Sequence, residues 1–285
     1  MGRWKLKIGF QTFQAYNIQT HFRMNPFVEL PLLCFAACSI VMILVWIWAY
    51  RIQNAGVVDI FWAFNFTIIA IMLYFLADGY PARKEVVCLL CGLWSLRLGI
   101  YLLIRVGSHL EHEEGRYAQL RKEWGPKPDR TFFIFFQAQA MSNIFLATPF
   151  FIIALNKSQP LSLPEMIGAG MWFVCIIFEG LSDYQLQNFR KNPANKGKVC
   201  QDGLWNYSRH PNYFFQFMIW VSIFIFACSS PYGWISIVCP ATIFYLLWKV
   251  TGIPMTEEQS LRSRGDLFRE YQRTTSVFIP WFKKK

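Results

Sequence analysis

The sequence of 285 residues contains few charged residues, because Asp, Glu, Lys and Arg together make up only 16% of it. Soluble domains carry about 25%. Hydrophobic residues instead make up 54% and aromatic residues 18%, with 28 Phe, 12 Trp and 12 Tyr. This balance excludes an ordinary soluble domain and predicts a polytopic membrane protein.

Several ligand-site motifs are also missing. The sequence contains no G-x-G-x-x-G and no P-loop, which excludes a Rossmann dinucleotide site and a Walker nucleotide site. His and Glu residues cluster in 109–114 without a standard zinc spacing, so we expect a solvated segment and no metal site. Most of the eight cysteines lie in apolar runs, where cysteine behaves as a small hydrophobe. The pair Cys88 and Cys91 has no second pair, and we discount it as a metal site.

The formal net charge is +11. No basic helix or RNA-binding signature accompanies this charge, so we expect no nucleic-acid partner. The basic residues lie mainly in short loops between apolar runs, where the positive-inside rule places them. Residues 1–26 begin with basic residues but lack the apolar core and cleavage site of a signal peptide. We expect that segment to lie at a membrane surface or to be disordered.

About seven apolar runs approach the roughly 20 residues that a bilayer requires. They cover 27–50, 57–77, 85–106, 132–155, 165–185, 212–228 and 232–250. The sequence therefore predicts an all-α membrane protein with a single membrane domain, 27–285. About seven spans place the termini on opposite sides, and the denser basic loops put the C-terminus in the cytoplasm. We expect the host membrane to be a bacterial inner membrane or the endoplasmic reticulum.

Ionisable residues within the spans are informative, because an unpaired charge in lipid is costly. Asp59 lies near the start of the second run and Arg97 lies in the third. One interpretation is an internal ion pair between them that fixes helix register. The other is that both residues line a pocket open to the cytoplasm.

The stretch 202–213, D-G-L-W-N-Y-S-R-H-P-N-Y, is polar and cationic and directly precedes an apolar run. Asp202-Gly203 predicts a turn, and Pro211 is suited to the first position of a helix. In one interpretation Arg209 only reaches to lipid phosphates from a juxtamembrane loop. In the other, the stretch belongs to a ligand site.

A second polar segment precedes this stretch. Asp183, Gln187 and Arg190 share a helical face, and Lys198 follows within a basic segment. Cations suit phosphates, and carboxylates suit ribose hydroxyls, so a nucleotide held between helices by side chains fits this pattern. Further along the tail, we expect Thr256 to cap a short helix and Gly265 to end it.

Three motifs together resemble the steroid 5α-reductase superfamily, most closely its bacterial-type branch. They are S-D-Y-Q-L-Q-N-F-R-K, the 202–213 stretch, and T-G-I-P-M-T-E-E-Q-S-L-R-S-R-G. N-A-G-V-V-D-I-F-W and L-W-S-L-R-L-G-I-Y-L-L-I-R also match, so the resemblance runs from about Gln53 to Trp281. It implies a seven-helix membrane oxidoreductase, similar to 3-oxo-5α-steroid 4-dehydrogenase. Such an enzyme uses NADPH to saturate a C=C bond conjugated to a carbonyl in a steroid-like or isoprenoid lipid.

The resemblance also implies which residues bind the cofactor, mostly within 165–285, with the tail closing the site. The residues on nucleotide-site motifs are Asp183, Arg190, Tyr207, Arg209, His210, Asn212 and Tyr213, and those on the tail motif are Glu258, Arg262 and Arg264. Lys198 joins them from the basic segment. The superfamily usually has Glu where Gln216 stands and Asn near Glu179, so the lipid need not be a steroid.

In the superfamily a Gln-Glu pair and a Tyr polarise the substrate carbonyl, whereas here Asp59 is the only acid near the first place and Trp94 or Arg97 occupies the other. We therefore expect Arg97 to donate to the substrate carbonyl and Asp59 to orient Arg97. Membrane lipids are the expected partners, and no obligate protein partner is implied. R-H-P-N-Y before an apolar helix also resembles isoprenylcysteine carboxyl methyltransferases, which use S-adenosylmethionine. A non-catalytic lipid-binding protein is the third alternative.

Overall fold

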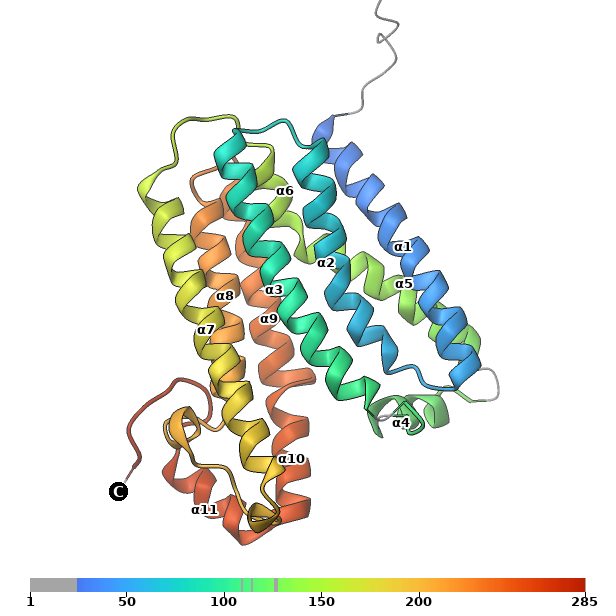
Figure 1. Ribbon diagram of the computed structural model, residues 1–285, viewed down its shortest axis with the longest axis vertical. Helices are drawn as coiled ribbons and strands as arrows, with labels where there is room; N and C mark the ends of the chain where they lie inside the picture. The colour runs from blue at the N-terminus through green and yellow to red at the C-terminus, as the bar shows by residue number, and fades with distance from the viewer. Residues whose placement is uncertain (1–24, 109, 114, 126–127, 285) are drawn as a thin grey trace, which may run out of the picture.

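The computed structural model describes residues 25–284 apart from 109, 114, 126 and 127. Almost all of the N-terminal segment 1–26 lies outside the described residues. The helices in chain order are α1 (Pro26–Ile52), α2 (Val57–Leu76), α3 (Pro81–Gly107), α4 (Gly115–Glu123), α5 (Pro128–Leu146), α6 (Thr148–Ala154), α7 (Leu163–Lys191), α8 (Pro211–Ala227), α9 (Val238–Tyr245), α10 (Ile253–Arg264) and α11 (Asp266–Thr274). The expected all-α class is confirmed (Figure 1).

The helices also confirm a polytopic membrane protein. Among the described residues, five helical stretches are long and apolar enough to cross a membrane: α1, α2, α3, α7 and 233–264, which contains α9 and α10. The pair α5 and α6, bent by 42°, adds a sixth, and α8 is a shorter apolar helix of 17 residues. The apolar runs expected from the sequence therefore all fall on helices of the described chain.

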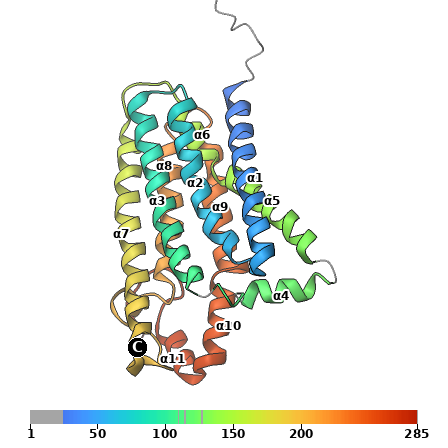
Figure 2. The same ribbon diagram turned by 45° about the vertical axis from the view of Figure 1, so that its right-hand side comes forward.

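Figures 1 and 2 show how these helices are arranged. α1, α2 and α5 lie at one side of the bundle, and α3, α7, α8 and α9 lie at the other (Figure 1). The chain enters α1 at the upper end of Figure 1, whereas α4, α10, α11 and the C-terminus lie at the lower end. We use these two names, upper end and lower end, throughout.

Aromatic rings in edge-to-face contact fill the centre of the bundle. The ring of Trp94 in α3 lies 5.1 Å from Phe66 of α2 and 5.3 Å from Trp220 of α8, measured between centroids. Phe150 of α6 lies 6.5 Å from Phe66 and 6.2 Å from Trp220. Edge-to-face pairs are favourable beyond the area they bury. This cluster therefore holds four helices together.

A buried ion pair joins the helices at the upper end. Arg83, in the first turn of α3, is 1% exposed and pairs with Glu165 in the first turn of α7. Arg83 also donates to the carbonyls of Asn156 at 3.1 Å and Ser158 at 2.5 Å. Glu165 in turn forms a capping box with Ser162. Because both charges have several partners, the pair fixes the start of α7 relative to α3.

The tail after α11 folds back onto the segment before α8. Ser276 forms a β-bridge with Ser208, and the backbone N–H of Arg209 donates to the Ser276 carbonyl at 2.8 Å. The N–H of Trp281 donates to the Tyr207 carbonyl at 2.9 Å. The tail is therefore attached along the 202–213 stretch.

Candidate functional site

The 202–213 stretch adopts the local structure that its sequence predicts. Gly203 has a φ of 57° and opens a short 3₁₀ helix, Gly203–Asn206. This left-handed φ favours glycine, and a Cβ at this position would also displace the Gln185 side-chain amide, whose nitrogen would lie 2.2 Å away. Pro211 occupies the first turn of α8, where a missing N–H costs nothing. Both predictions are confirmed.

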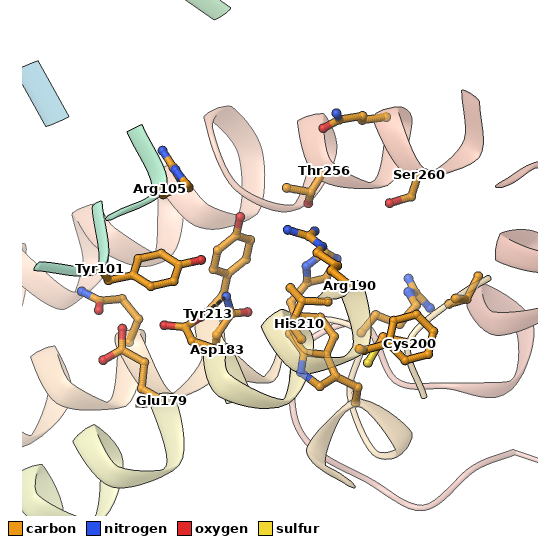
Figure 3. A pocket seen from close by; sticks show the side chains of 18 of the residues that line it. Tyr101, Arg105, Glu179, Asp183, Arg190, Cys200, His210, Tyr213, Thr256 and Ser260 are labelled. Atoms are coloured by element: carbon orange, nitrogen blue, oxygen red, sulfur yellow. Dashed lines mark hydrogen bonds between the residues drawn. The ribbon is translucent and has the colours of Figure 1, made fainter. Parts of the chain in front are cut away.

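A cavity of about 420 Å³ opens at the lower end and is lined by residues of α3, α7, α8, α10 and α11. Figure 3 shows polar side chains from several of these elements around it. Residues of the 202–213 stretch, among them Trp205, Arg209 and His210, line the cavity, so the predicted motif lies at the cavity wall. We call the part near Arg97 the inner end and the part near Arg190 the mouth.

Charged side chains of α3 and α7 meet at the inner end. Arg97 of α3 forms ion pairs with Glu179 at 2.5 Å and Asp183 at 3.0 Å. The two carboxylates are four residues apart and therefore share one face of α7. Asn212 of α8 donates to Asp183 at 3.2 Å. The inner end thus links three helices through polar contacts within the apolar bundle.

Besides Arg97 Nη2, which has only its ion pair with Glu179, three buried atoms at the inner end have no hydrogen-bond partner within the described part of the chain: Arg97 Nε, Glu179 Oε2 and Asn212 Oδ1. The Glu179 side chain is only 5% exposed. Buried polar groups are nearly always hydrogen-bonded, so atoms left over in a cavity indicate a ligand or water. They include one donor and two acceptors, and a polar ligand that offers both kinds of group would satisfy them.

The mouth is cationic. Arg190, in the last turn of α7, is exposed and makes no ion pair or hydrogen bond with any residue that the structure describes. Arg264, at the end of α10, donates to the Lys198 carbonyl at 2.9 Å and to the Ser260 hydroxyl at 3.3 Å. These contacts hold Arg264 beside the loop that follows α7. The mouth thus combines one positioned arginine with one that is available to a ligand.

Arg209 also lines the cavity, but its guanidinium is already bonded to other parts of the chain. It donates to Glu257 of α10 at 2.7 Å and to the carbonyls of Gln272 and Thr275 at 2.9 and 2.8 Å. Its side chain is 10% exposed. Arg209 therefore fastens the start of α8 to α10 and the tail.

His210 lies beside this arginine. Its ring Nε2 is 3.1 Å from Glu257 Oε1, and the ring stacks on Tyr213 with a centroid distance of 5.3 Å. Burial lowers the pKa of His210 below its ordinary value of 6.5, although the hydrogen bond to Glu257 opposes this shift. The ring is therefore neutral at pH 7.

The comparisons with known proteins identify the family. The family described as a protein of unknown function, DUF1295, matches residues 45–275. The chain belongs to this family. It is also similar to an uncharacterized protein of Schizosaccharomyces pombe, with 24% identity over 322 positions that cover 98% of this chain and 90% of the relative. No solved structure matches the chain.

Most of the residues predicted for the site of this DUF1295 protein lie around one cavity. The predicted residues that line it are Arg97, Asp183, Arg190, Arg209, His210, Asn212, Tyr213 and Arg264. They come from segments more than 160 residues apart in sequence, from α3 to the end of α10. The predicted motifs, although separated in the sequence, therefore lie together in space.

The expected pair of Asp59 and Arg97 is wrong. Arg97 pairs with Glu179 and Asp183, whereas Asp59 accepts a hydrogen bond from the Tyr117 hydroxyl of α4 at 2.7 Å. Asp59 lies in the first turn of α2, and the antiparallel α3 ends beside that turn. Arg97 lies about 15 Å before the end of α3, at 1.5 Å per residue, and is therefore at a different level of the bundle from Asp59. Asp59 is not among the residues that line the cavity.

Four further predicted residues lie outside the cavity lining. Lys198 contributes its backbone carbonyl to Arg264. Tyr207 is 41% exposed and contacts the tail through Phe282. Glu258 and Arg262 pair with each other on the exposed face of α10.

Other lining residues were not in the predicted set, among them Tyr101, Thr256 and Ser260 (Figure 3). Tyr101 lies one turn after Arg97 on α3, so the four-residue spacing could have identified it. Thr256 lies inside α10 and does not cap it, because the helix already begins at Ile253. Gly265 does end α10, as predicted.

Proposed function

We propose that this protein is a membrane-embedded reductase that binds NADPH in the lower-end cavity. Its substrate would be a lipid that carries a C=C bond conjugated to a carbonyl, the reaction implied by the resemblance to the steroid 5α-reductase superfamily. The observation that carries the proposal is that Asp183, Arg190, His210, Asn212 and Tyr213, residues on the nucleotide-site motifs, all line one cavity.

The chemistry of the cavity fits such a cofactor. Arg190 and Arg264 supply charge for phosphate groups at the mouth, and guanidinium groups bind phosphates well. The unpartnered Arg97 Nε, Glu179 Oε2 and Asn212 Oδ1 supply a donor and two acceptors at the inner end. When bound, NADPH would supply the hydride for the reduction.

Residues of the chain would bind and polarise the substrate. Leu98, Leu102 and Leu247 line the cavity and provide apolar contact for a lipid. Arg97 keeps Nε available to donate to a carbonyl oxygen, and such a donor stabilises negative charge that develops there. Glu179 and Asp183, in place of Asp59, would hold Arg97 in position.

The charge distribution supports a cytoplasmic lower end. The upper-end turns carry Arg83, Lys84 and Lys157, and Arg83 is neutralised by Glu165. The lower end carries the basic residues of α4, of the segment after α7, and of α10 and α11. By the positive-inside rule, this distribution supports a cavity mouth that faces the cytoplasm, where NADPH is available.

A membrane methyltransferase is the second candidate. Glu179 and Asp183 form an acidic pair at the inner end, and a buried carboxylate would suit the cationic sulfur of S-adenosylmethionine. Arg190 at the mouth, which has no partner in the described part of the chain, favours NADPH instead, because S-adenosylmethionine carries no phosphate. A non-catalytic lipid-binding protein would bind neither.

A thermal-shift titration tests the proposal. Detergent-purified protein is titrated with NADPH, NADP⁺, NADH and S-adenosylmethionine. A ligand at about 100 times its dissociation constant raises the apparent unfolding free energy by roughly 2.7 kcal/mol. We expect NADPH and NADP⁺ to stabilise the protein. Stabilisation by S-adenosylmethionine alone would replace the reductase with the methyltransferase, and no response to any ligand would support the lipid-binding protein.

A further inference from the structure

A second hollow lies outside the cofactor cavity, along the C-terminal tail. It is an open groove of about 560 Å³, lined by tail residues that include Thr275, Ser276, Ile279, Trp281, Phe282 and Lys284. Neither the resemblance nor the proposed reaction uses this groove. Its lining combines aromatic, cationic and hydroxyl groups.

Apolar side chains of the groove are exposed although the backbone that carries them is held in place. Ile279, Trp281 and Phe282 are 60%, 68% and 74% exposed. The N–H of Trp281 donates to the Tyr207 carbonyl at 2.9 Å, and the N–H of Lys284 donates to the Thr274 carbonyl at 2.8 Å. A fixed, exposed apolar cluster of this kind usually marks an interaction site.

Polar groups beside these side chains indicate what the partner carries. Thr275 is only 3% exposed, and its hydroxyl has no hydrogen-bond partner among the described residues. A buried hydroxyl without a partner is uncommon and indicates a missing acceptor or donor. Lys284 adds an exposed cation to the same groove. An anionic oxygen would satisfy both groups.

The place of the groove identifies the source of such a group. The tail is attached to Tyr207 and Arg209, directly before the first turn of α8. It therefore lies beside the start of an apolar helix at the lower end (Figure 1), where we expect that helix to leave the bilayer. Trp side chains are enriched at this boundary, and basic residues near it bind anionic lipid.

We propose that this groove binds an anionic phospholipid of the surrounding membrane. The lipid phosphate would lie against Thr275 and Lys284, and the acyl region would lie against Ile279, Trp281 and Phe282. The proposal does not depend on the reductase reaction, because all of these residues lie outside the cofactor cavity.

Lipid binding would also stabilise the wall of the cofactor cavity. Arg209 lines both hollows, and its guanidinium donates to the Thr275 carbonyl while its N–H donates to the Ser276 carbonyl. A lipid that orders Thr275 and Ser276 therefore also orders Arg209. A lipid that binds the tail only in its folded state raises the stability of that folded state.

Hydrogen exchange in vesicles tests the proposal. The full chain is reconstituted into phosphatidylcholine alone or into phosphatidylcholine mixed with phosphatidylglycerol, and exchange is followed in peptides covering 205–211 and 275–284. We expect slower exchange with phosphatidylglycerol. In a native mass spectrometry competition, Lys284→Ala should weaken phosphatidylglycerol binding about five-fold, which corresponds to about 1 kcal/mol for one lysine.

Matched variants complete the experiment. Thr275→Val removes the hydroxyl with little change of shape and should reduce the phosphatidylglycerol effect, as should Trp281→Ala. Trp234→Ala and Lys157→Ala, which change an exposed aromatic and an exposed lysine at the upper end, should retain it. Equal exchange in both kinds of vesicle, or equal losses in the control variants, would overturn the proposal. So would the same slowing by inorganic phosphate in phosphatidylcholine vesicles, because the ligand would then be a soluble anion.

Discussion

Arg190 and Arg209 line the same cavity, yet the structure predicts opposite consequences for their loss. Arg190 is exposed at the mouth and has no partner within the described chain, so Arg190→Ala should leave the fold intact. Arg209 is only 10% exposed and donates to Glu257, to the Gln272 carbonyl of α11 and to the Thr275 carbonyl of the tail, so Arg209→Ala should loosen the tail. Ligand affinity and stability therefore separate the two roles.

The expected magnitudes follow from these contacts. A charge-assisted hydrogen bond to a phosphate contributes roughly 1.5–3 kcal/mol, and the solvent exposure of Arg190 favours the lower value. Arg190→Ala should therefore raise the NADPH dissociation constant about ten-fold. Its unfolding free energy should change by less than about 0.5 kcal/mol. Arg209→Ala leaves Glu257 without its arginine and should cost about 3 kcal/mol of stability.

The assay is NADPH binding by calorimetry, paired with thermal unfolding of the same detergent-purified samples. Lys191→Ala is the matched control, because it removes an exposed cation next to Arg190 that does not line the cavity. An unchanged NADPH affinity in Arg190→Ala would refute the assignment of the mouth to phosphates. An equal loss in Lys191→Ala would show that only the general positive field matters.

Four further predictions concern other parts of the molecule. Arg83→Met strands the buried Glu165 and should cost about 3–5 kcal/mol of stability without altering NADPH affinity, measured as above. Asp59→Asn weakens the bond to Tyr117 and should lower the melting temperature while NADPH affinity stays unchanged. Because the His210 pKa is lowered in the fold, the unfolded chain binds protons first, so stability should fall as the pH drops below about 6.5, and His210→Gln should reduce this slope in pH-dependent unfolding. Reporters inserted near Lys196 and fused after residue 285 should both report cytoplasm, and a signal from the opposite side would place the cavity away from NADPH.

The sequence predicted what depends on local chemistry. Apolar run length predicted the helices, and Gly203, Pro211 and Gly265 predicted a turn, a helix start and a helix end. The motifs also indicated the α7 and α8 residues that line the cavity, because those residues lie close to one another in the chain. These features require little knowledge of how distant helices pack.

The sequence could not predict which acid meets which base across helices. Glu257 and Glu258 are adjacent, and consecutive helix residues point about 100° apart. Glu257 therefore faces Arg209 and His210, while Glu258 faces solvent and pairs with Arg262. The Asp59–Arg97 prediction failed for a related reason, because the axial register of α2 against α3 depends on packing that no motif reports.

The positions of the charge pairs bear on the choice between the two candidate cofactors. At the inner end, the charge of Arg97 is already met by Glu179 and Asp183, so no excess positive charge remains there. At the side wall, Glu257 meets Arg209. The mouth differs, because Arg264 bonds only neutral acceptors and Arg190 has no partner among the residues described. Uncompensated positive charge is therefore concentrated at the mouth, which favours a ligand with several phosphate charges at one end over one whose charge is a cationic sulfur.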